Sequence, residues 1–172
     1  NMKVAVYGIG AIGAHVATSL QLIGFDVSGW AQSYKPELAI KQEIGPEGWI
    51  KLLSENQLHI CLLPLTNTTK GLFNKTAFAA MLQGSYFINA GRGRQVVEAD
   101  LLASIKAGHI AGAALDVFCE EPLPQAHPFW QEPKIAIWPH VAARTNPDTA
   151  AQQITAAIGA IKSGHMPLNI VN

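Results

Sequence analysis

Three glycines near the start of the chain have the spacing of a phosphate-binding turn. Gly8, Gly10 and Gly13 form a Gly-x-Gly-x-x-Gly pattern between the apolar run Met2–Tyr7 and a stretch with apolar residues at helical spacing. The pattern predicts a strand, a tight turn and a helix N-terminus, with room at Gly10 for a pyrophosphate. Free backbone N–H groups and the helix dipole would hold the anion. A dinucleotide site is therefore expected here.

The segment after the second expected strand indicates which dinucleotide binds. An acidic residue at this point would accept hydrogen bonds from the adenosine ribose and repel a 2′-phosphate. No acid occurs between Asp26 and Glu37, and the segment reads Trp30-Ala31-Gln32-Ser33-Tyr34-Lys35. Hydroxyls, an amide and an ammonium group suit a phosphate, which favours NADP(H) over NAD(H). The alternative is that Lys35 is a solvated surface charge and that cofactor choice is loose.

Expected strands and helices, which could position these residues, alternate along the whole chain. Strands are expected at 2–7, 27–30, 39–44, 59–63, 86–89, 112–117 and 134–138, and helices at 11–23, 46–54, 74–82, 98–106 and 146–162. In the first helix, Ile12, Val16, Leu20 and Ile23 are expected to share one face. The alternation predicts an α/β fold, a Rossmann-type doubly wound parallel sheet with helices on both faces. Ligands bind such sheets beyond the carboxyl ends of the strands.

Four further motifs follow strand-like runs and carry a family resemblance. They are Pro64-Leu65-Thr66-Asn67-Thr68-Thr69-Lys70-Gly71-Leu72, Asn89-Ala90-Gly91-Arg92-Gly93, Leu115-Asp116-Val117-Phe118-Cys119-Glu120-Glu121-Pro122-Leu123 and Ile137-Trp138-Pro139-His140-Val141-Ala142. With the opening glycines, they make the chain resemble the D-isomer-specific 2-hydroxyacid dehydrogenases, and among these the glyoxylate/hydroxypyruvate reductases. The resemblance extends over essentially the whole chain.

The resemblance implies three catalytic residues. Arg92 matches the family's substrate arginine, and a guanidinium can bind a 2-oxo acid's carboxylate and polarise the adjacent carbonyl. His140 matches the acid/base, since an imidazole can protonate the carbonyl oxygen as hydride arrives. Glu121 matches its partner, because a nearby carboxylate favours the imidazolium and orients the ring. Arg94 is close to Arg92, and only the family motif distinguishes the two.

The glycine motif, the Trp30–Lys35 segment and the resemblance together define the expected cofactor site. Asp116 matches a position that contacts the nicotinamide amide, and Pro64 and Thr66 match a loop on the adenosine side. The candidates are Gly8, Gly10, Ala11, Ile12, Gly13, Trp30, Ala31, Gln32, Ser33, Lys35, Leu63, Pro64, Thr68, Ala90, Gly91, Arg92, Asp116 and His140.

Two residues depart from the family pattern. Trp138 stands where a small or β-branched residue is common, and it either narrows the substrate mouth or only packs. Gln32 stands where NADP-preferring relatives often carry an arginine, which weakens the case for NADP(H).

Family members also have a second domain, mostly upstream of the nucleotide-binding domain, that helps to hold the substrate. Residues 1–172 are therefore expected to be the NAD(P)-binding domain of a longer enzyme, without its substrate domain. The resemblance also implies a homodimer, formed through the Pro-rich connection 122–133.

Composition excludes several classes of function. Twelve basic residues balance twelve acidic ones, so no basic excess is present to hold a nucleic acid or an anionic membrane. No apolar run reaches membrane-spanning length, and no secretory signal is evident. Cys61 and Cys119 are expected to be buried thiols of a cytoplasmic protein. No Cys/His cluster has metal-ligand spacing, so no metal is implied.

The expected function is thus the reduction of a small 2-oxo acid such as glyoxylate or hydroxypyruvate, with NAD(P)H as hydride donor. A different substrate in the same reaction class, such as a larger 2-oxo acid or phosphite, stays open. The alternative from another class is a dinucleotide-sensing interaction protein, like the family's transcriptional corepressors. The presence of all three catalytic residue types favours an enzyme.

Overall fold

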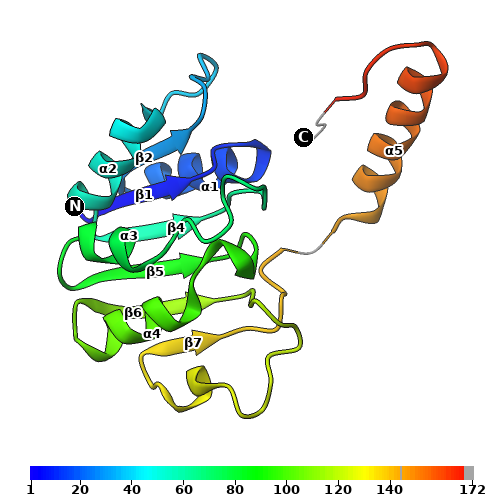
Figure 1. Cartoon of the computed structure of the whole chain (residues 1–172). Helices are drawn as coiled ribbons and strands as arrows, with labels where there is room; N and C mark the ends of the chain where they lie inside the picture. The colour runs from blue at the N-terminus through cyan, green and yellow to red at the C-terminus, as the bar shows by residue number, and fades with distance from the viewer. Residues whose placement is uncertain (144, 169–172) are drawn as a thin grey trace. The chain divides into compact units, whose positions relative to one another are not determined.

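The computed structural model describes residues 1–143 and 145–168, and they contain a seven-stranded parallel sheet (Figure 1). The strand order is β3-β2-β1-β4-β5-β6-β7, and every pair is parallel. The elements are β1 Lys3–Tyr7, α1 Ala11–Leu22, β2 Asp26–Ala31, β3 Lys41–Ile44, α2 Gly45–Glu55, β4 Leu58–Cys61, α3 Lys75–Ala80, β5 Ser85–Asn89, η1 Gly93–Gln95, α4 Glu98–Lys106, β6 Ile110–Leu115, η2 Pro128–Gln131, β7 Ile135–Ile137 and α5 Pro147–Lys162. The predicted doubly wound fold is confirmed.

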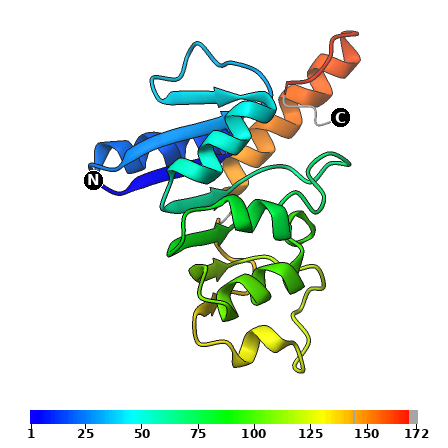
Figure 2. The ribbon, with the colours of Figure 1, turned by 60° about the vertical axis from the view of Figure 1, so that its left-hand side comes forward.

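Helices lie on both faces of the sheet, as predicted. The helices α2, α3 and α4 lie along one face (Figures 1 and 2), where Leu53, Phe78 and Leu101 pack with Tyr7 and Phe87 of the sheet. Helix α1 lies on the opposite face, where its Ala17 joins a smaller apolar cluster of β1 and β2 side chains. The apolar cluster on the face covered by α2, α3 and α4 is larger and more aromatic than the cluster on the α1 face.

The apolar face expected for the first helix is only partly buried. Ile12 and Ile23 are exposed, whereas Gly13 and Ala17 are the buried residues of α1. An added Cβ at Gly13 would lie 1.8 Å from the carbonyl oxygen of Gly8. Because the helix begins in contact with the turn before it, its small residues face the sheet and the larger ones are displaced to the surface.

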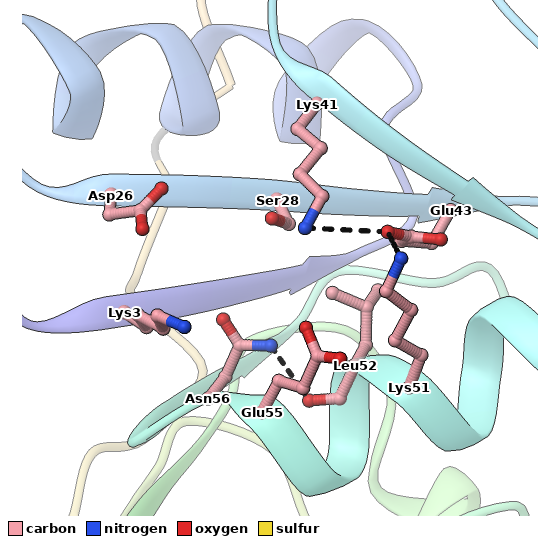
Figure 3. A pocket seen from close by; sticks show the side chains of 9 residues that line it. All are labelled: Lys3, Asp26, Ser28, Lys41, Glu43, Lys51, Leu52, Glu55 and Asn56. Atoms are coloured by element: carbon pink, nitrogen blue, oxygen red, sulfur yellow. Dashed lines mark hydrogen bonds and ion pairs between the residues drawn. The ribbon is translucent and has the colours of Figure 1, made fainter.

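A small pocket on the α2 face lies far along the strands from the glycine turn. Lys3 and Asp26, the first residues of β1 and β2, line it with Lys41, Glu43 and Lys51 (Figure 3). Glu43 forms ion pairs with Lys51 at 2.8 Å and with Lys41 at 3.5 Å. The pocket's volume of about 20 Å³ suffices for a water molecule and not for a dinucleotide.

The chain divides into two compact units, residues 1–140 and 141–172. The described part of the second unit is built around α5, which Asn146 caps by accepting hydrogen bonds from the amides of Asp148 and Thr149. Gly164 follows the helix with a φ of 76°, a conformation that favours glycine. No helix among the described residues is both long and apolar enough to cross a membrane.

The core of the first unit contains a neutral histidine. His59 of β4 is fully buried, and its Nδ1 lies 2.9 Å from the hydroxyl of Tyr7. Burial lowers the pKa of His59 to about 4. An unfolded histidine titrates near its ordinary pKa of about 6.5, so protons bind preferentially to the unfolded chain between these values.

We therefore expect the unfolding free energy to fall as pH decreases from about 6.5 to about 4, by up to about 3 kcal/mol from this residue. In His59→Gln the amide does not titrate, and the decline between pH 6.5 and 5 should become shallower. Urea unfolding of both proteins at a series of pH values measures the difference. Equal slopes would show that His59 is not the group responsible.

Candidate functional site

The order of the strands reverses between β1 and β4, and two loops border this point. Gly8 and Gly10 lie in the β1–α1 turn, Gly13 lies in the first turn of α1, and Leu62 and Leu63 follow β4. Gly8 has a φ of 94°, and an added Cβ there would lie 2.9 Å from the Leu62 carbonyl. The two loops therefore pass each other too closely for any other residue at Gly8. In open α/β sheets such a reversal is where dinucleotides bind.

The geometry of the turn fits a pyrophosphate. Gly10 is the N-cap residue of α1 and makes no side-chain capping bond, and the first turn of the helix contains no acidic residue. An added Cβ at Gly10 would meet nothing within 4 Å, so the backbone is open to an approaching ligand. Unpaired N–H groups at the N-terminus of a twelve-residue helix attract an anion. Ala11 and Ile12 are exposed beside it.

The segment expected to recognise the adenosine end comprises the last two residues of β2, Trp30 and Ala31, and the start of the connection from β2 to β3. The Trp30 indole turns inward and donates to the Gly45 carbonyl at 2.9 Å, while the side chain of Ala31 is buried. Gln32 and Ser33 are exposed and Lys35 is half-buried. Gln42 of β3 braces this connection, because its amide accepts from the Lys35 N–H and donates to the Lys35 carbonyl. The polar side chains are thus presented from a loop of fixed shape.

The loop after β4 is closed by threonine hydroxyls. Thr69 is buried, donates to the Pro64 carbonyl at 2.7 Å and accepts from the Thr66 amide at 2.8 Å. The hydroxyls of Thr66 and Thr68 lie 3.0 Å apart. Thr69 was not among the predicted site residues, although it lies in a motif that the sequence singled out. Its hydroxyl fixes the path of Leu63 and Pro64 past the glycine turn.

The predicted catalytic motifs follow three neighbouring strands. Asn89, Leu115 and Ile137 end β5, β6 and β7 in one register row. Beyond this row, the Asp116 amide donates to the Asn89 carbonyl, and the His140 amide donates to the Asp116 carbonyl. These backbone bonds keep the three motifs side by side after the strands have ended. Asp116 is buried, and its carbonyl is the hydrogen-bond partner of the His140 amide.

His140 and Glu121 form the predicted pair. The His140 Nδ1 lies 2.8 Å from the Glu121 Oε2, and the Glu121 Oε1 accepts from the Phe118 amide at 3.0 Å. Burial raises the pKa of Glu121, but the Phe118 amide, His140 and the charge of Arg92 outweigh it and lower the pKa below its usual range. Because an ionised carboxylate only accepts hydrogen bonds, His140 must donate from Nδ1. Its Nε2 is then the nitrogen that can exchange a proton with a ligand.

The backbone of His140 is in an unusual conformation. Its φ is 57°, the only positive value among the non-glycine residues that the structure describes. Such conformations cost roughly 1–3 kcal/mol and cluster at functional sites. Here the hydrogen bond from the His140 amide to Asp116 maintains the conformation.

Arg92 lies in the turn after β5, beyond the carboxyl end of that strand. Its side chain is exposed, and its Nη1 donates to the Gly91 carbonyl at 2.7 Å. Its effect on the pKa of Glu121 places its positive charge within electrostatic reach of the histidine–glutamate pair. At Gly93, an added Cβ would lie 1.9 Å from the Phe118 carbonyl carbon, so the turn packs against the segment that carries Glu121. A carboxylate and the carbonyl beside it could therefore bind between Arg92 and His140.

Two buried amides in this region escaped the sequence analysis. The Asn89 side chain accepts from the Gly91 amide and donates to the Arg92 carbonyl. Gln95 is fully buried and contacts both the Arg92 turn and the loop after β4. Asn89 belongs to one of the four motifs, and an Asn at the end of a strand, before a turn, is typical of an Asx turn. Nothing in the sequence distinguishes Gln95 from a surface residue.

The two cysteines differ in their surroundings. Cys61 is buried as predicted, but Cys119 is exposed, which contradicts the prediction that both are core thiols. Cys119 lies in the loop after β6, and its amide donates to Glu98. Although the residue is exposed, partial burial of its thiol and the nearby carboxylate of Glu98 raise the pKa of Cys119 to about 11, so the thiol is mostly protonated at neutral pH. Among the described residues, no group of three or more His, Cys, Asp or Glu side chains could hold a metal ion.

Comparison with known proteins places this geometry in a family. Residues 1–142 match the family model described as D-isomer specific 2-hydroxyacid dehydrogenase, NAD binding domain. Glyoxylate/hydroxypyruvate reductase A of Serratia proteamaculans is 42% identical over the whole chain, which spans 55% of that protein. The chain thus spans about half the length of the curated relatives it matches.

Solved structures support the same family assignment. A D-isomer specific 2-hydroxyacid dehydrogenase from Xanthobacter autotrophicus Py2, in complex with NADPH and MES, is 40% identical, with a TM-score of 0.94 over 99% of this chain and 71% of that chain. An NADPH-dependent glyoxylate/hydroxypyruvate reductase from Sinorhizobium meliloti, in complex with NADP and sulfate, is 34% identical, with a TM-score of 0.90 over 99% of this chain and 55% of that one. By sequence, by fold and by the order of its motifs, the chain belongs to the D-isomer-specific 2-hydroxyacid dehydrogenase family.

Proposed function

We propose that this chain is the NAD(P)-binding domain of a reductase that acts on a small 2-oxo acid, such as glyoxylate or hydroxypyruvate. The observation that carries the proposal is the hydrogen-bonded pair of His140 and Glu121 beside the charge of Arg92, at the edge of a sheet with a dinucleotide-type turn. The substrate domain would lie in the rest of the protein, since the relatives are about twice as long as this chain.

The residues have separate tasks in this proposal. A bound nicotinamide cofactor would supply the hydride. Arg92 would bind the carboxylate of the 2-oxo acid and polarise its carbonyl. His140 would give the proton on Nε2 to the carbonyl oxygen, and Glu121 would hold the ring through Nδ1 and stabilise its charged form. Turnover of glyoxylate or hydroxypyruvate by the full-length protein tests the proposal, and absence of turnover with both would reject this substrate class.

The cofactor residues proposed are the eighteen named from the sequence, of which the glycine turn and the Trp30–Lys35 segment matter most. NADP(H) is the proposed cofactor. Its support is the lack of an acidic residue between Asp26 and Glu37 and the NADPH and NADP of two similar structures. Since the Trp30 indole packs against α2, Ser33 and Lys35 are the side chains proposed to meet the 2′-phosphate.

We expect the protein to bind NADPH more tightly than NADH, and Lys35→Ala to reduce this preference by about tenfold, since one charge-assisted hydrogen bond contributes on the order of 1.4 kcal/mol. Fluorescence titration with both nucleotides measures the preference. Lys134→Ala, a change in an exposed lysine before β7, is the control and should leave it unchanged. Equal affinities of the wild-type protein for NADPH and NADH would contradict the assignment.

We further propose a cytoplasmic homodimer. Two free cysteines suit a reducing compartment, and Trp130 is 53% exposed within the connection 122–133 that is proposed as the interface. Sedimentation of the full-length protein and cell fractionation test the two statements separately.

A further inference from the structure

Gln95 uses every hydrogen-bonding group of its side chain to connect two loops. Its Nε2 donates to the carbonyls of Leu63 at 2.7 Å and Pro64 at 3.0 Å. Its Oε1 accepts from the Arg92 amide at 2.9 Å and from the Cys61 thiol at 3.2 Å. The residue is 0% exposed. A primary amide is the side-chain group that offers two donors and an acceptor with two lone pairs in this geometry.

The two connected loops belong to different parts of the proposed site. Leu63 and Pro64 follow β4 at the reversal of strand order, where the dinucleotide is proposed to lie. Arg92 is the proposed substrate residue. Without the Gln95 amide, the Arg92 N–H and the Leu63 carbonyl would each lose a hydrogen-bond partner, whereas the Pro64 carbonyl would keep the Thr69 hydroxyl. Unpaired buried polar groups are costly. The loops would then have to move to recover hydrogen bonds.

The space between the loops is matched to this side chain. An added Cβ at Gly91 would lie 2.5 Å from the Gln95 Oε1 and 3.0 Å from the Leu63 carbonyl oxygen. Gly91 is also held by the Asn89 side chain, so the turn cannot shift freely to make room. The position of the Arg92 backbone is therefore set by contacts with the loop after β4 as well as by its own turn.

We propose that Gln95 is a positioning residue, which ties the backbone of Arg92 to the Leu63–Pro64 loop and so aligns the substrate arginine with the bound dinucleotide. The proposal rests on the proposed function, because it takes Arg92 as the group that binds the substrate carboxylate. Gln95 itself touches neither ligand. Its effect on substrate binding is exerted through Arg92.

The test replaces Gln95 with the similarly shaped methionine in the full-length protein, and uses oxalate as a probe for the 2-oxo acid. Gln95→Met should weaken oxalate binding to the NADP-loaded protein by about tenfold and raise KM for glyoxylate similarly, with a smaller change in kcat. In an Arg92→Ala background, the same change should weaken oxalate binding by less than about twofold, because residues acting through one another are not additive.

Asn56→Leu is the matched control. Asn56 is also a buried amide, and it donates to the Leu52 carbonyl, but its contacts lie on α2. Both variants should lose thermal stability, and only Gln95→Met should change oxalate binding. If both leave oxalate affinity within twofold of wild type, or if Gln95→Met has its full effect without Arg92, the positioning role is rejected.

Two further measurements keep the test decisive. Should Gln95→Met not fold, Gln95→Glu retains the shape and the acceptor for the Arg92 amide but loses the paired donors. It should weaken NADPH binding more than oxalate binding, and the reverse order would oppose the proposal. Hydrogen exchange at the Arg92 amide should rise in Gln95→Met and not in Asn56→Leu. If the wild-type protein binds no oxalate, the proposed function fails, whereas unchanged exchange at Arg92 rejects the role of Gln95 alone.

Discussion

Replacing His140 with glutamine should lower kcat for glyoxylate reduction by roughly 10²–10⁴-fold, the usual contribution of general acid catalysis. Glutamine can still donate a hydrogen bond to Glu121, but it cannot deliver a proton to a carbonyl oxygen. The affinity for NADPH should stay within about threefold of wild type, because the glycine turn and the β2–β3 connection are unaffected. Steady-state kinetics and fluorescence titration of the full-length variant measure the two quantities.

The chain contains a matched control for this experiment. His127 also faces a carboxylate, with its Nε2 3.6 Å from Glu98, but it lies at the start of η2. His127→Gln should leave kcat nearly unchanged. If His140→Gln turned over glyoxylate as fast as wild type, His140 would not be the acid. If instead the wild-type protein bound NADPH but reduced neither glyoxylate nor hydroxypyruvate, a protein that binds the dinucleotide without chemistry would become the better hypothesis.

Replacing Arg92 with lysine should lower kcat/KM for glyoxylate by roughly 10²–10³-fold, as expected when one preorganised donor to a reacting carbonyl is lost. Lysine keeps the charge but not the planar fork that pairs with a carboxylate and its neighbouring oxygen. Part of the loss should appear as a higher KM. Initial rates over a wide range of glyoxylate concentrations separate KM from kcat.

Arg94→Lys distinguishes a specific arginine from a general need for positive charge. Arg94 lies two residues away in the same turn and is exposed. Its variant should retain kcat/KM within about twofold. Equal losses in both variants would mean that the family motif has been placed on the wrong arginine, or that the turn as a whole is sensitive to substitution.

The sequence predicted the order of elements well because most strands lie in short apolar runs bounded by Gly, Pro or polar residues. The ends of strands were less predictable. The apolar run after Ile60 continues through Leu62 and Leu63, but β4 ends at Cys61. The reason is that Tyr7, Cys61 and Asn89 share one register row, and the neighbouring strands end there. A strand's length is set by its partners, which a single run does not reveal.

Burial was harder to predict than secondary structure. Helical spacing put Ile12 and Ile23 on an apolar face, yet Gly13 contacts the preceding turn and draws small residues against the sheet. Cys119 was expected in the core because cysteines are usually buried, but it lies in an exposed part of the loop after β6.

The residues of the candidate site also divide into those that the sequence identified and those that it did not. His140, Glu121 and Arg92 were identified because each belongs to a short motif, and the structure brings the first two into a hydrogen bond. Gln95 and Thr69 act through contacts with residues distant in sequence or with backbone carbonyls. Their residue types carry no signal of this, since a glutamine or a threonine is ordinarily found on the surface.

The central place of β1 in the sheet has a consequence for synthesis on the ribosome. Val4 pairs with Val27 of β2 on one side and with Leu58 of β4 on the other. At roughly 5–20 residues per second, the nascent chain carries β1 for seconds before β4 can emerge to cover its second edge. An unpaired strand edge invites mispairing with other chains during that interval. Substitutions that delay the docking of β4 should therefore reduce soluble yield more than equally destabilising substitutions in β7. This strand lies at the edge of the sheet and pairs only with β6.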